Sequence, residues 1–249
     1  MISFAFHKRF DVPFDTGQRT FDQPYLLHAS QGTFHLETEA RTWLLLPHRA
    51  ALIRRGVSIR IWTVAPTVSS SVLFDAALDE LFPSPCQIVA VTPLMVQMIA
   101  YATRWNEQRA QADQAAPVFF KALAQVAVEA AQTPDQAWFP RAQSADLQRA
   151  VACTLSGLGS ALRFADVAAA ACISERTLTR RFAEELGMSW QQFLQRVRVI
   201  HAAKLLTLTR KPVTEIAYAA GMSSASALAA QFRNLLGETP TAYRRRLRG

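Results

Sequence analysis

The chain has 249 residues, half of them hydrophobic, which is enough for two domains with cores of their own. Its first residues, MISFAFHKRF, lack the long apolar core of a secretion signal, and no apolar run reaches the ~18 residues that span a bilayer, so we expect a cytoplasmic protein with no membrane partner. The cysteines Cys86, Cys153 and Cys172 are isolated in apolar surroundings, which predicts buried free thiols rather than disulfides or a metal site.

The net charge of +8 is unevenly distributed along the chain. Residues 1–143 carry 12 basic and 12 acidic side chains, whereas residues 144–249 carry 15 basic and 7 acidic ones. This asymmetry is typical of a nucleic-acid or other anionic partner for the C-terminal part. A solvated basic surface without a partner explains the charge equally well, so the charge alone leaves both alternatives open.

The N-terminal part is predicted to be rich in strands over residues 24–91. Apolar and polar residues alternate over 33–37, where Phe34 and Leu36 share one face, and again over 57–64. The intervening turn residues are Gly32, Pro47 and Gly56. Short strands at this spacing favour a small barrel or sandwich.

The pattern changes to helical periodicity after residue 92. A Thr-Pro pair typical of a helix start opens a helix over 93–105, and a second helix covers 117–132. Residues 133–143 contain two prolines and are interpreted as a linker. From residue 144 onward the whole sequence is predicted to be helical.

A short helical unit appears twice in the C-terminal part. In FADVAAAACISERTLTRRFAEELG, Ser174 is placed to cap a helix and Gly187 to end it. Its buried stripe at four-residue spacing comprises Leu178, Phe182 and Leu186. A short helix, a tight turn and a second helix with one apolar stripe form a helix-turn-helix, whose second helix can enter a DNA major groove. An ordinary helical hairpin fits one such copy equally well.

The second copy, PVTEIAYAAGMSSASALAAQFRNLLG, keeps the apolar framework with one extra residue in its turn. The segment between the copies predicts one helix over 189–207, about 28 Å long at about 1.5 Å per residue. Successive major grooves on one side of DNA lie about 34 Å apart, so such a helix can hold two groove-reading helices at a suitable distance.

These features resemble the DNA-binding domain of AraC-type (AraC/XylS) transcriptional regulators over residues 145–249. The matching residues are Val167-Ala168, Ser174, Leu178, Arg181-Phe182, Leu186-Gly187, Val197-Arg198, Ala202, Leu205-Leu206, Ile216-Ala217, Gly221-Met222, Phe232-Arg233, Gly237, Thr239-Pro240 and Tyr243-Arg244. The final run QFRNLLGETPTAYRRR is the most specific part of the match.

The resemblance implies that the second helix of each unit faces the DNA bases. The residues carried over for base reading are Glu175, Arg176, Thr179 and Arg180 in the first unit, and Ser224, Ser226 and Gln231 in the second. The second unit has alanine where the family commonly has larger side chains, notably Ala230, so it is predicted to add position and weak discrimination only. Loss of DNA contact by the second unit is the alternative.

Other basic residues are predicted to contact phosphate: Arg181, Lys211, Arg244 and Arg245, the last two in a flexible tail. Arg198 is predicted to be a half-buried structural residue of the connecting helix.

Residues 24–91 resemble, more loosely, the cupin-type sensing barrel of many such regulators. The histidines lack the paired spacing of a cupin metal centre, so we expect no metal and no cofactor. The candidates for effector binding are His28, His35, Trp43, Arg60 and Trp62, although packing or solvent exposure is the better explanation for each of them taken singly.

The resulting expectation is an α+β protein with a cupin-like β domain over 1–92, a helical region over 93–132, a linker over 133–143 and an AraC-type domain over 144–249. The helical region either forms a dimer surface or covers the barrel, and the sequence leaves both alternatives open. It predicts a regulator rather than an enzyme, with double-stranded DNA, a small-molecule effector, a second copy of the chain and RNA polymerase as partners. A cupin-type enzyme and a basic helical adaptor without specific DNA reading are the competing interpretations.

Overall fold

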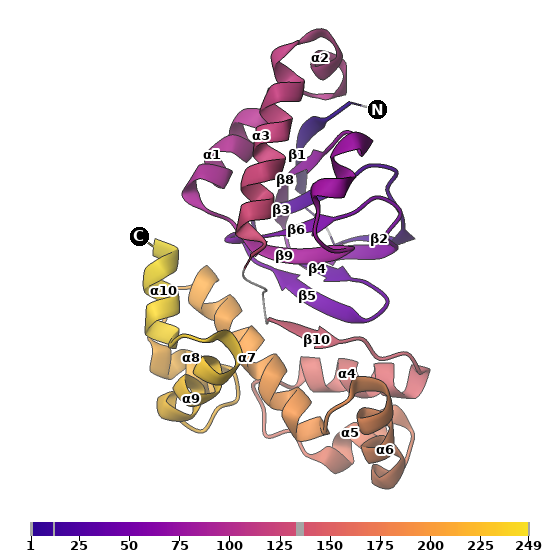
Figure 1. Cartoon of the computed structure of the whole chain (residues 1–249). Coiled ribbons are helices and arrows are strands. Elements are labelled where there is room, and N and C mark those ends of the chain that lie inside the picture. The colour runs from indigo at the N-terminus through magenta and orange to yellow at the C-terminus, as the bar shows by residue number, and fades with distance from the viewer. Residues whose placement is uncertain (1, 12, 133–136, 249) are drawn as a thin grey trace. The chain divides into compact units, whose positions relative to one another are not determined.

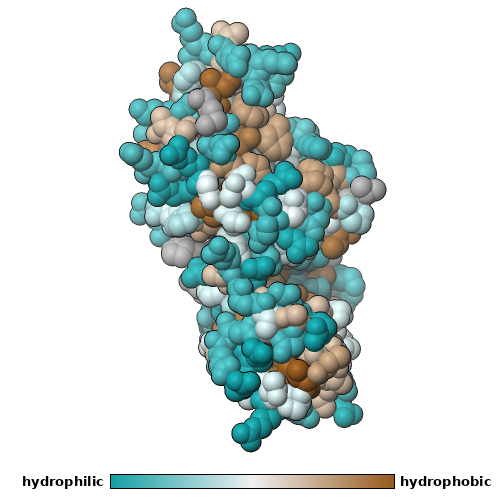
Figure 2. Space-filling model, turned by 90° about the vertical axis from the view of Figure 1, so that its right-hand side faces the viewer, coloured by the Kyte–Doolittle hydropathy of each residue, from teal (hydrophilic) through white to brown (hydrophobic). Residues whose placement is uncertain are grey.

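The computed structural model describes residues 2–11, 13–132 and 137–248, and the chain divides into two compact units, Met1–Asp135 and Gln136–Gly249. The first unit combines two β-sheets with helices, and the second is helical apart from one short strand (Figure 1). The predicted α+β class is confirmed. On the face drawn in Figure 2, hydrophilic residues prevail and hydrophobic residues form separate patches.

Two antiparallel sheets make up the β part of the first unit. One has the strand order β1-β8-β3-β6-β9, and the other contains β5-β4-β7-β2. Their bounds are β1 Phe4–Phe10, β2 Phe14–Arg19, β3 Tyr25–Gln31, β4 Phe34–Glu37, β5 Arg41–Leu45, β6 Arg49–Ile53, β7 Ile59–Thr63, β8 Thr67–Leu73 and β9 Cys86–Ala90. The predicted alternation is confirmed over 34–37 and 59–63, because Phe34, Leu36, Ile59 and Ile61 are buried while the residues between them are half-exposed. It does not extend to the ends of the predicted ranges, since Thr33 is buried and Val57 is half-exposed.

The strand-rich region begins earlier than the sequence predicted. Strands β1 and β2 precede residue 24, and β1 pairs along its whole length with β8, from Phe4 opposite Leu73 to Phe10 opposite Thr67. This pairing supplies hydrogen-bond partners to a polar segment, HKR, that has no apolar alternation of its own.

Three helices cover one face of the first sheet: α1 Pro93–Ala102, α2 Glu107–Ala112 and α3 Ala115–Ala130. Side chains such as Leu26 and Val72 from the sheet share a core with Met95 of α1 and Phe120 of α3. A 3-10 helix, η1 Ala76–Leu81, adds to this layer. The helices predicted over 93–105 and 117–132 are therefore confirmed with shifted ends, and α2 was not foreseen.

The second unit contains β10 Trp138–Pro140 and the helices α4 Ala145–Ser156, α5 Phe164–Ala171, α6 Glu175–Leu186, α7 Trp190–Leu208, α8 Val213–Ala219, α9 Ala225–Leu236 and α10 Pro240–Arg248. The predicted linker over 133–143 includes residues 133–136, which lie outside the described residues, and the strand β10. The flexible tail predicted for the basic end is wrong, because that segment is α10. Its Tyr243 is buried and packs edge-on against Phe232, with 5.2 Å between ring centroids.

The three cysteines are unpaired thiols, as predicted, but they are not all buried. Cys86 and Cys153 are half-buried, whereas Cys172 is exposed. Burial raises the pKa of Cys86 to about 12. In the described part of the chain, no helix is both long and apolar enough to cross a membrane.

Candidate nucleic-acid interface

The first helix-turn-helix consists of α5 and α6. Helix α5 ends at Cys172, which adopts a left-handed conformation with φ of 59°. Two residues later Ser174 begins α6, and its side chain accepts a hydrogen bond from the backbone N–H of Thr177. Gly187 ends α6 in the left-handed conformation. The predicted caps of this helix are confirmed, and they fix where its exposed face starts and stops.

The second helix-turn-helix consists of α8 and α9 and repeats these features. Gly221, with φ of 76°, takes the place of Cys172, and the Ser224 side chain accepts from the N–H of Ala227. Two residues lie between Gly221 and Ser224 along the chain, against one between Cys172 and Ser174. The predicted extra residue in the second turn is confirmed.

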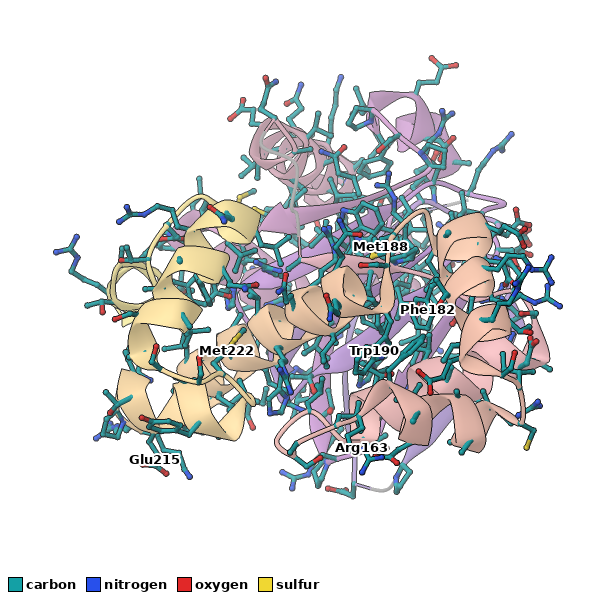
Figure 3. All side chains as sticks on the ribbon, turned by 90° about the horizontal axis from the view of Figure 1, so that it is seen from below. Arg163, Phe182, Met188, Trp190, Glu215 and Met222 are labelled. Atoms are coloured by element: carbon teal, nitrogen blue, oxygen red, sulfur yellow. The ribbon has the colours of Figure 1, made fainter. Side chains whose placement is uncertain are left out.

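Helix α7 carries both units, one on each half. In its first half, Phe193 packs against Phe182 of α6 with 5.6 Å between ring centroids. In its second half, Val199 and Leu206 join one core with Phe232 of α9. Phe182 and Trp190 accordingly lie at one end of α7, and Glu215 and Met222 at the other (Figure 3).

Helix α6 presents a polar outer face. Glu175, Arg176, Thr179 and Arg180 are all exposed, whereas the stripe predicted to be buried is fully buried. The Thr179 hydroxyl donates to the backbone oxygen of Glu175, and the Arg180 guanidinium lies 3.5 Å from Glu184. The four residues predicted for base reading thus lie together on one helix face.

Helix α9 presents a much smaller polar surface. Ser226 and Ala230 are exposed, Gln231 is half-buried, and the Ser224 hydroxyl is engaged in capping the helix. The predicted set for this unit therefore lies at the start and margin of α9, with alanines between its members.

Sequence comparison places this double unit among known proteins. Residues 167–246 match a family model described as a helix-turn-helix domain. An uncharacterised HTH-type transcriptional regulator of Staphylococcus aureus is 42% identical over 71 residues, which are 28% of this chain and 10% of that protein. The matched region therefore spans only about a tenth of the length of this curated relative.

Two further relatives extend the comparison. The HTH-type transcriptional regulator NimR of Escherichia coli K12 is 26% identical over 224 residues, which are 89% of this chain and 80% of NimR. The DNA-binding domain of AdpA, solved in complex with a target DNA, is 37% identical over 42% of this chain and 95% of that chain, with a TM-score of 0.40. Residues 167–246 belong to the AraC-type helix-turn-helix family. The resemblance seen in the sequence is confirmed for these residues.

Within the AraC-type domain, Arg181 has a different place from the one predicted. Its guanidinium lies 3.4 Å from Asp146 of α4 and 3.4 Å from Glu185 of α6. Glu185 also accepts hydrogen bonds from the backbone N–H groups of Gln143 and Ser144. Arg181 therefore joins α4 to α6 between two carboxylates, and its charge is already compensated within the protein, so we withdraw it as a phosphate contact.

The other predicted phosphate contacts of the AraC-type domain are distributed unevenly. Lys211 is exposed beside Glu215 and Arg245 is exposed on α10, whereas Arg244 is half-buried. Arg198 is half-buried on α7, as predicted, and burial lowers its pKa.

In the first unit, three predicted effector residues do not line an interior. His35 stacks on Trp62 at 4.8 Å, and the Arg60 guanidinium lies 5.1 Å from the Trp62 ring. These side chains occupy the half-exposed face of β4 and β7, opposite the buried Phe34 and Ile61. Arg60 also donates to Asp15, and this hydrogen bond lowers the pKa of Asp15 to about 2. The alternation in the sequence shows two faces without showing which one is covered, and the structure places these three candidates on the less buried face.

The two remaining effector candidates, His28 and Trp43, are buried and do not belong to the group of His35, Arg60 and Trp62. The His28 Nε2 atom lies 2.8 Å from the backbone oxygen of Pro47, and burial lowers the pKa of His28. Trp43 of β5 lines an open pocket of about 720 Å³ together with Cys86 and Ile88 of β9. Its lining also includes Thr38, Glu39, Arg41, Ser58 and Ser84. No signal in the sequence pointed to these residues, because 38–43 and 84–88 belong to different sheets and meet only in the folded unit. The described residues hold no group of three or more His, Cys, Asp or Glu side chains suited to a metal ion.

The Glu185 contacts make the stability of the AraC-type domain dependent on acid. Burial alone would raise the pKa of Glu185, but hydrogen bonds from the Ser144 side chain and from the backbone of Ser144 and Gln143 lower it. Such a carboxylate stabilises the folded state above its unfolded pKa of about 4.3, and this stabilisation is lost as pH falls through the lower folded value.

We therefore expect Glu185→Gln to lower the free energy of unfolding at pH 7 by about 1.5–3 kcal/mol, the range for hydrogen bonds to charged groups. It also flattens the fall in stability below pH 4.5. Urea denaturation across pH tests both effects. The matched control is Glu184→Gln, an exposed residue of the same helix, which is expected to change stability by less than about 1 kcal/mol. Equal effects of the two substitutions would contradict this account.

Proposed function

We propose that the protein is a sequence-specific DNA-binding transcriptional regulator. In this proposal α6 reads bases, and the N-terminal unit, Met1–Asp135, senses a small molecule. The observation that supports this most is the exposed face of α6. Four polar side chains, two of them arginines, stand on a helix whose other face is locked by Leu178, Phe182 and Leu186. A rigid helix with such a face is suited to entering the major groove.

Each side chain of this face has a chemical role in reading bases. Arg176 and Arg180 carry forked donors that match the O6 and N7 acceptors of guanine, Glu175 can accept from the cytosine amino group, and Thr179 can contact either type of edge. The pair between Arg180 and Glu184 is exposed and contributes little, so its release on binding DNA costs less than about 1 kcal/mol.

The second helix-turn-helix, formed by α8 and α9, has the role of positioning the protein on the DNA. Ser226 and Gln231 offer short or marginal polar groups, and the alanines at 225, 227 and 230 offer contact with thymine methyl groups. Lys211 of the same unit, and Arg244 and Arg245 of α10, are proposed to contact phosphates, which adds affinity without sequence preference. The related AdpA domain was solved with a target DNA, which supports double-stranded DNA as the partner of this domain.

The effector is proposed to bind at the pocket between β5 and β9. Its lining combines apolar side chains, among them Trp43 and Ile88, with hydroxyl groups and side chains of both signs of charge. A pocket of about 720 Å³ matches the usual size of small-molecule sites. Binding there regulates transcription if the effector has different affinities for two arrangements of the protein. His28, His35, Arg60 and Trp62 lie outside this pocket and are no longer included.

A second copy of the chain is proposed to pack on α1 and α3. These helices leave Leu94, Tyr101 and Val118 exposed, and Tyr101, Val118 and Phe119 line a groove of about 540 Å³. Exposed apolar side chains gathered on neighbouring helices are typical of a protein interface.

The base-reading proposal predicts a loss of specificity from one substitution. Arg180→Ala is expected to weaken binding to the cognate site by about 1–3 kcal/mol and to relax the preference at one base pair. Arg245→Ala is expected to weaken binding to all sequences alike and to reduce the salt dependence. Titrations against selected and scrambled DNA at several salt concentrations separate the two. If Arg180→Ala loses equal affinity on both DNAs, α6 does not read bases as proposed.

The pocket proposal predicts that filling the pocket abolishes ligand stabilisation. A panel of small amphipathic molecules is screened by thermal unfolding, since a ligand at 100 times its Kd stabilises by about 2.7 kcal/mol. Ser58→Trp places a bulky ring in the pocket lining and is expected to remove the shift given by any hit. Thr20→Trp, at an exposed position of the same unit, is expected to keep it. Retention of the shift in Ser58→Trp would place the ligand elsewhere.

The dimer proposal predicts that a charge on α3 gives monomers. Val118→Asp introduces a carboxylate at a side chain that is 73% exposed, so the fold tolerates it while an apolar interface does not. Val64→Asp, at a valine of the same unit that is 65% exposed, is the control. Sedimentation velocity is expected to find dimers for the wild type and Val64→Asp, and monomers for Val118→Asp. A dimeric Val118→Asp would rule out this surface.

A further inference from the structure

The segment that leads from α4 to the first helix-turn-helix touches the second helix-turn-helix directly. The contact is made by the loop over residues 157–160, which follows α4, and by the turn between α8 and α9. This contact lies wholly within the C-terminal unit, Gln136–Gly249. Its three parts are Gly221 in the turn, Gly159 in the loop and Arg198 on α7.

Gly221 lies so close to the loop that no side chain fits. A Cβ atom built there would stand 2.1 Å from the backbone oxygen of Leu158 and 2.8 Å from Nε of Arg198. The left-handed φ of 76° also favours glycine at this position. Cys172 holds the equivalent place in the first turn, with φ of 59°, so conformation alone does not demand glycine. What distinguishes Gly221 is the approach of another backbone.

Arg198 lies between the two parts of this contact. Its terminal Nη2 atom is 3.4 Å from the backbone oxygen of Ser160, and its Nε and Nη2 atoms border Gly221. The Nε atom is buried and has no hydrogen-bond partner among the described residues. A half-buried guanidinium with an unsatisfied donor is a costly way to fill space, which points to a geometric role.

Gly159 adds a third contact of the same kind. A Cβ atom there would lie 3.1 Å from the backbone oxygen of Ala219, near the end of α8. The loop therefore meets the second helix-turn-helix at two backbone positions, on either side of Ala220. The second helix-turn-helix is thus held at two separate places, by α7 and by this loop. Such a double attachment restricts bending of α7.

We propose that Gly221, Arg198 and the loop over 157–160 form a latch that fixes the angle and distance between α6 and α9. The latch sets which spacing between two DNA segments the protein accepts. This second clause rests on the proposed DNA-binding function, whereas the first concerns the free protein and is tested separately. Arg198 is accordingly a positioning residue, which acts on DNA through the placement of the two helices.

The first experiment measures the distance between α6 and α9 in the full chain without DNA. Spin labels are attached through p-azidophenylalanine at Ala183 and Asn234, both exposed, so that the native cysteines remain in place. Pulsed electron resonance is expected to give one narrow distance distribution for the wild type. Gly221→Ala is expected to shift or broaden it, and Gly159→Ala to do so to a smaller extent.

The matched control is Gly237→Ala. Gly237 has the same φ of 76° as Gly221, but a Cβ atom there meets nothing within 4 Å. Both substitutions therefore carry the same backbone strain, and only Gly221→Ala adds the clash with Leu158. A wild-type distribution in Gly221→Ala, or equal broadening in both variants, would overturn the latch. Arg198→Met, which keeps the volume and removes the guanidinium, is expected to resemble Gly221→Ala.

The second experiment tests the consequence for DNA. A site is selected from random DNA with the wild-type protein, and one or two base pairs are inserted between its two protected segments. The wild type is expected to lose at least about tenfold in affinity, which is 1.4 kcal/mol, while Gly221→Ala loses less than about threefold. Equal spacing preference in both proteins refutes the role in spacing. Absence of selective binding by the wild type refutes the proposed function instead, and the distance measurement still decides on the latch.

Discussion

The C-terminal half of this protein depends on one helix that is buried from two sides. Helix α7 packs Phe193 against Phe182 of the first helix-turn-helix, and places Val199 and Leu206 in the core of the second. Each fully buried side chain of this kind contributes roughly 1.5–3 kcal/mol. Neither small unit has enough core of its own, so the helix that connects them also stabilises them. Stability and the spacing of the two units therefore come from the same residues.

The two units show how a repeated framework leaves its surface free to differ. Capping by Ser174 and Ser224, and burial of Phe182 and Phe232, fix the course of α6 and α9 in the same way. No such constraint acts on the outer faces, because exposed side chains contribute little to stability. Arginines can thus occupy one face and alanines the other while the backbone remains the same. The difference between the two units in chemistry leaves their fold unchanged.

The C-terminal fold could be predicted from the sequence because its signals are local. The caps, the buried stripes and the long helix each follow from residues within a few turns of one another, and each was confirmed. The N-terminal failures have the opposite origin. Strand β1 depends on pairing with β8, which lies some sixty residues away, and the pocket around Trp43 depends on the approach of β9. Alternation identified the two faces of β7 but gave no sign that Arg60 faces outward. Arg181 was misjudged for the same reason, because its partner Asp146 belongs to another helix.

The weak chemistry of α9 and the close contact at Gly221 fit together physically. Once α6 is bound, a rigidly attached α9 meets the DNA at a high effective concentration, so that even small contacts contribute to affinity. If α9 were loosely attached, ordering the second helix-turn-helix on the DNA would cost entropy, and this cost would offset much of that contribution. Short side chains on α9 are therefore useful only if something else fixes the position of that helix. The approach of Leu158 to Gly221, with Arg198 beside it, provides such a restraint. On this view the second helix-turn-helix needs few base contacts, because its main contribution is to be in the right place when the first helix-turn-helix binds DNA.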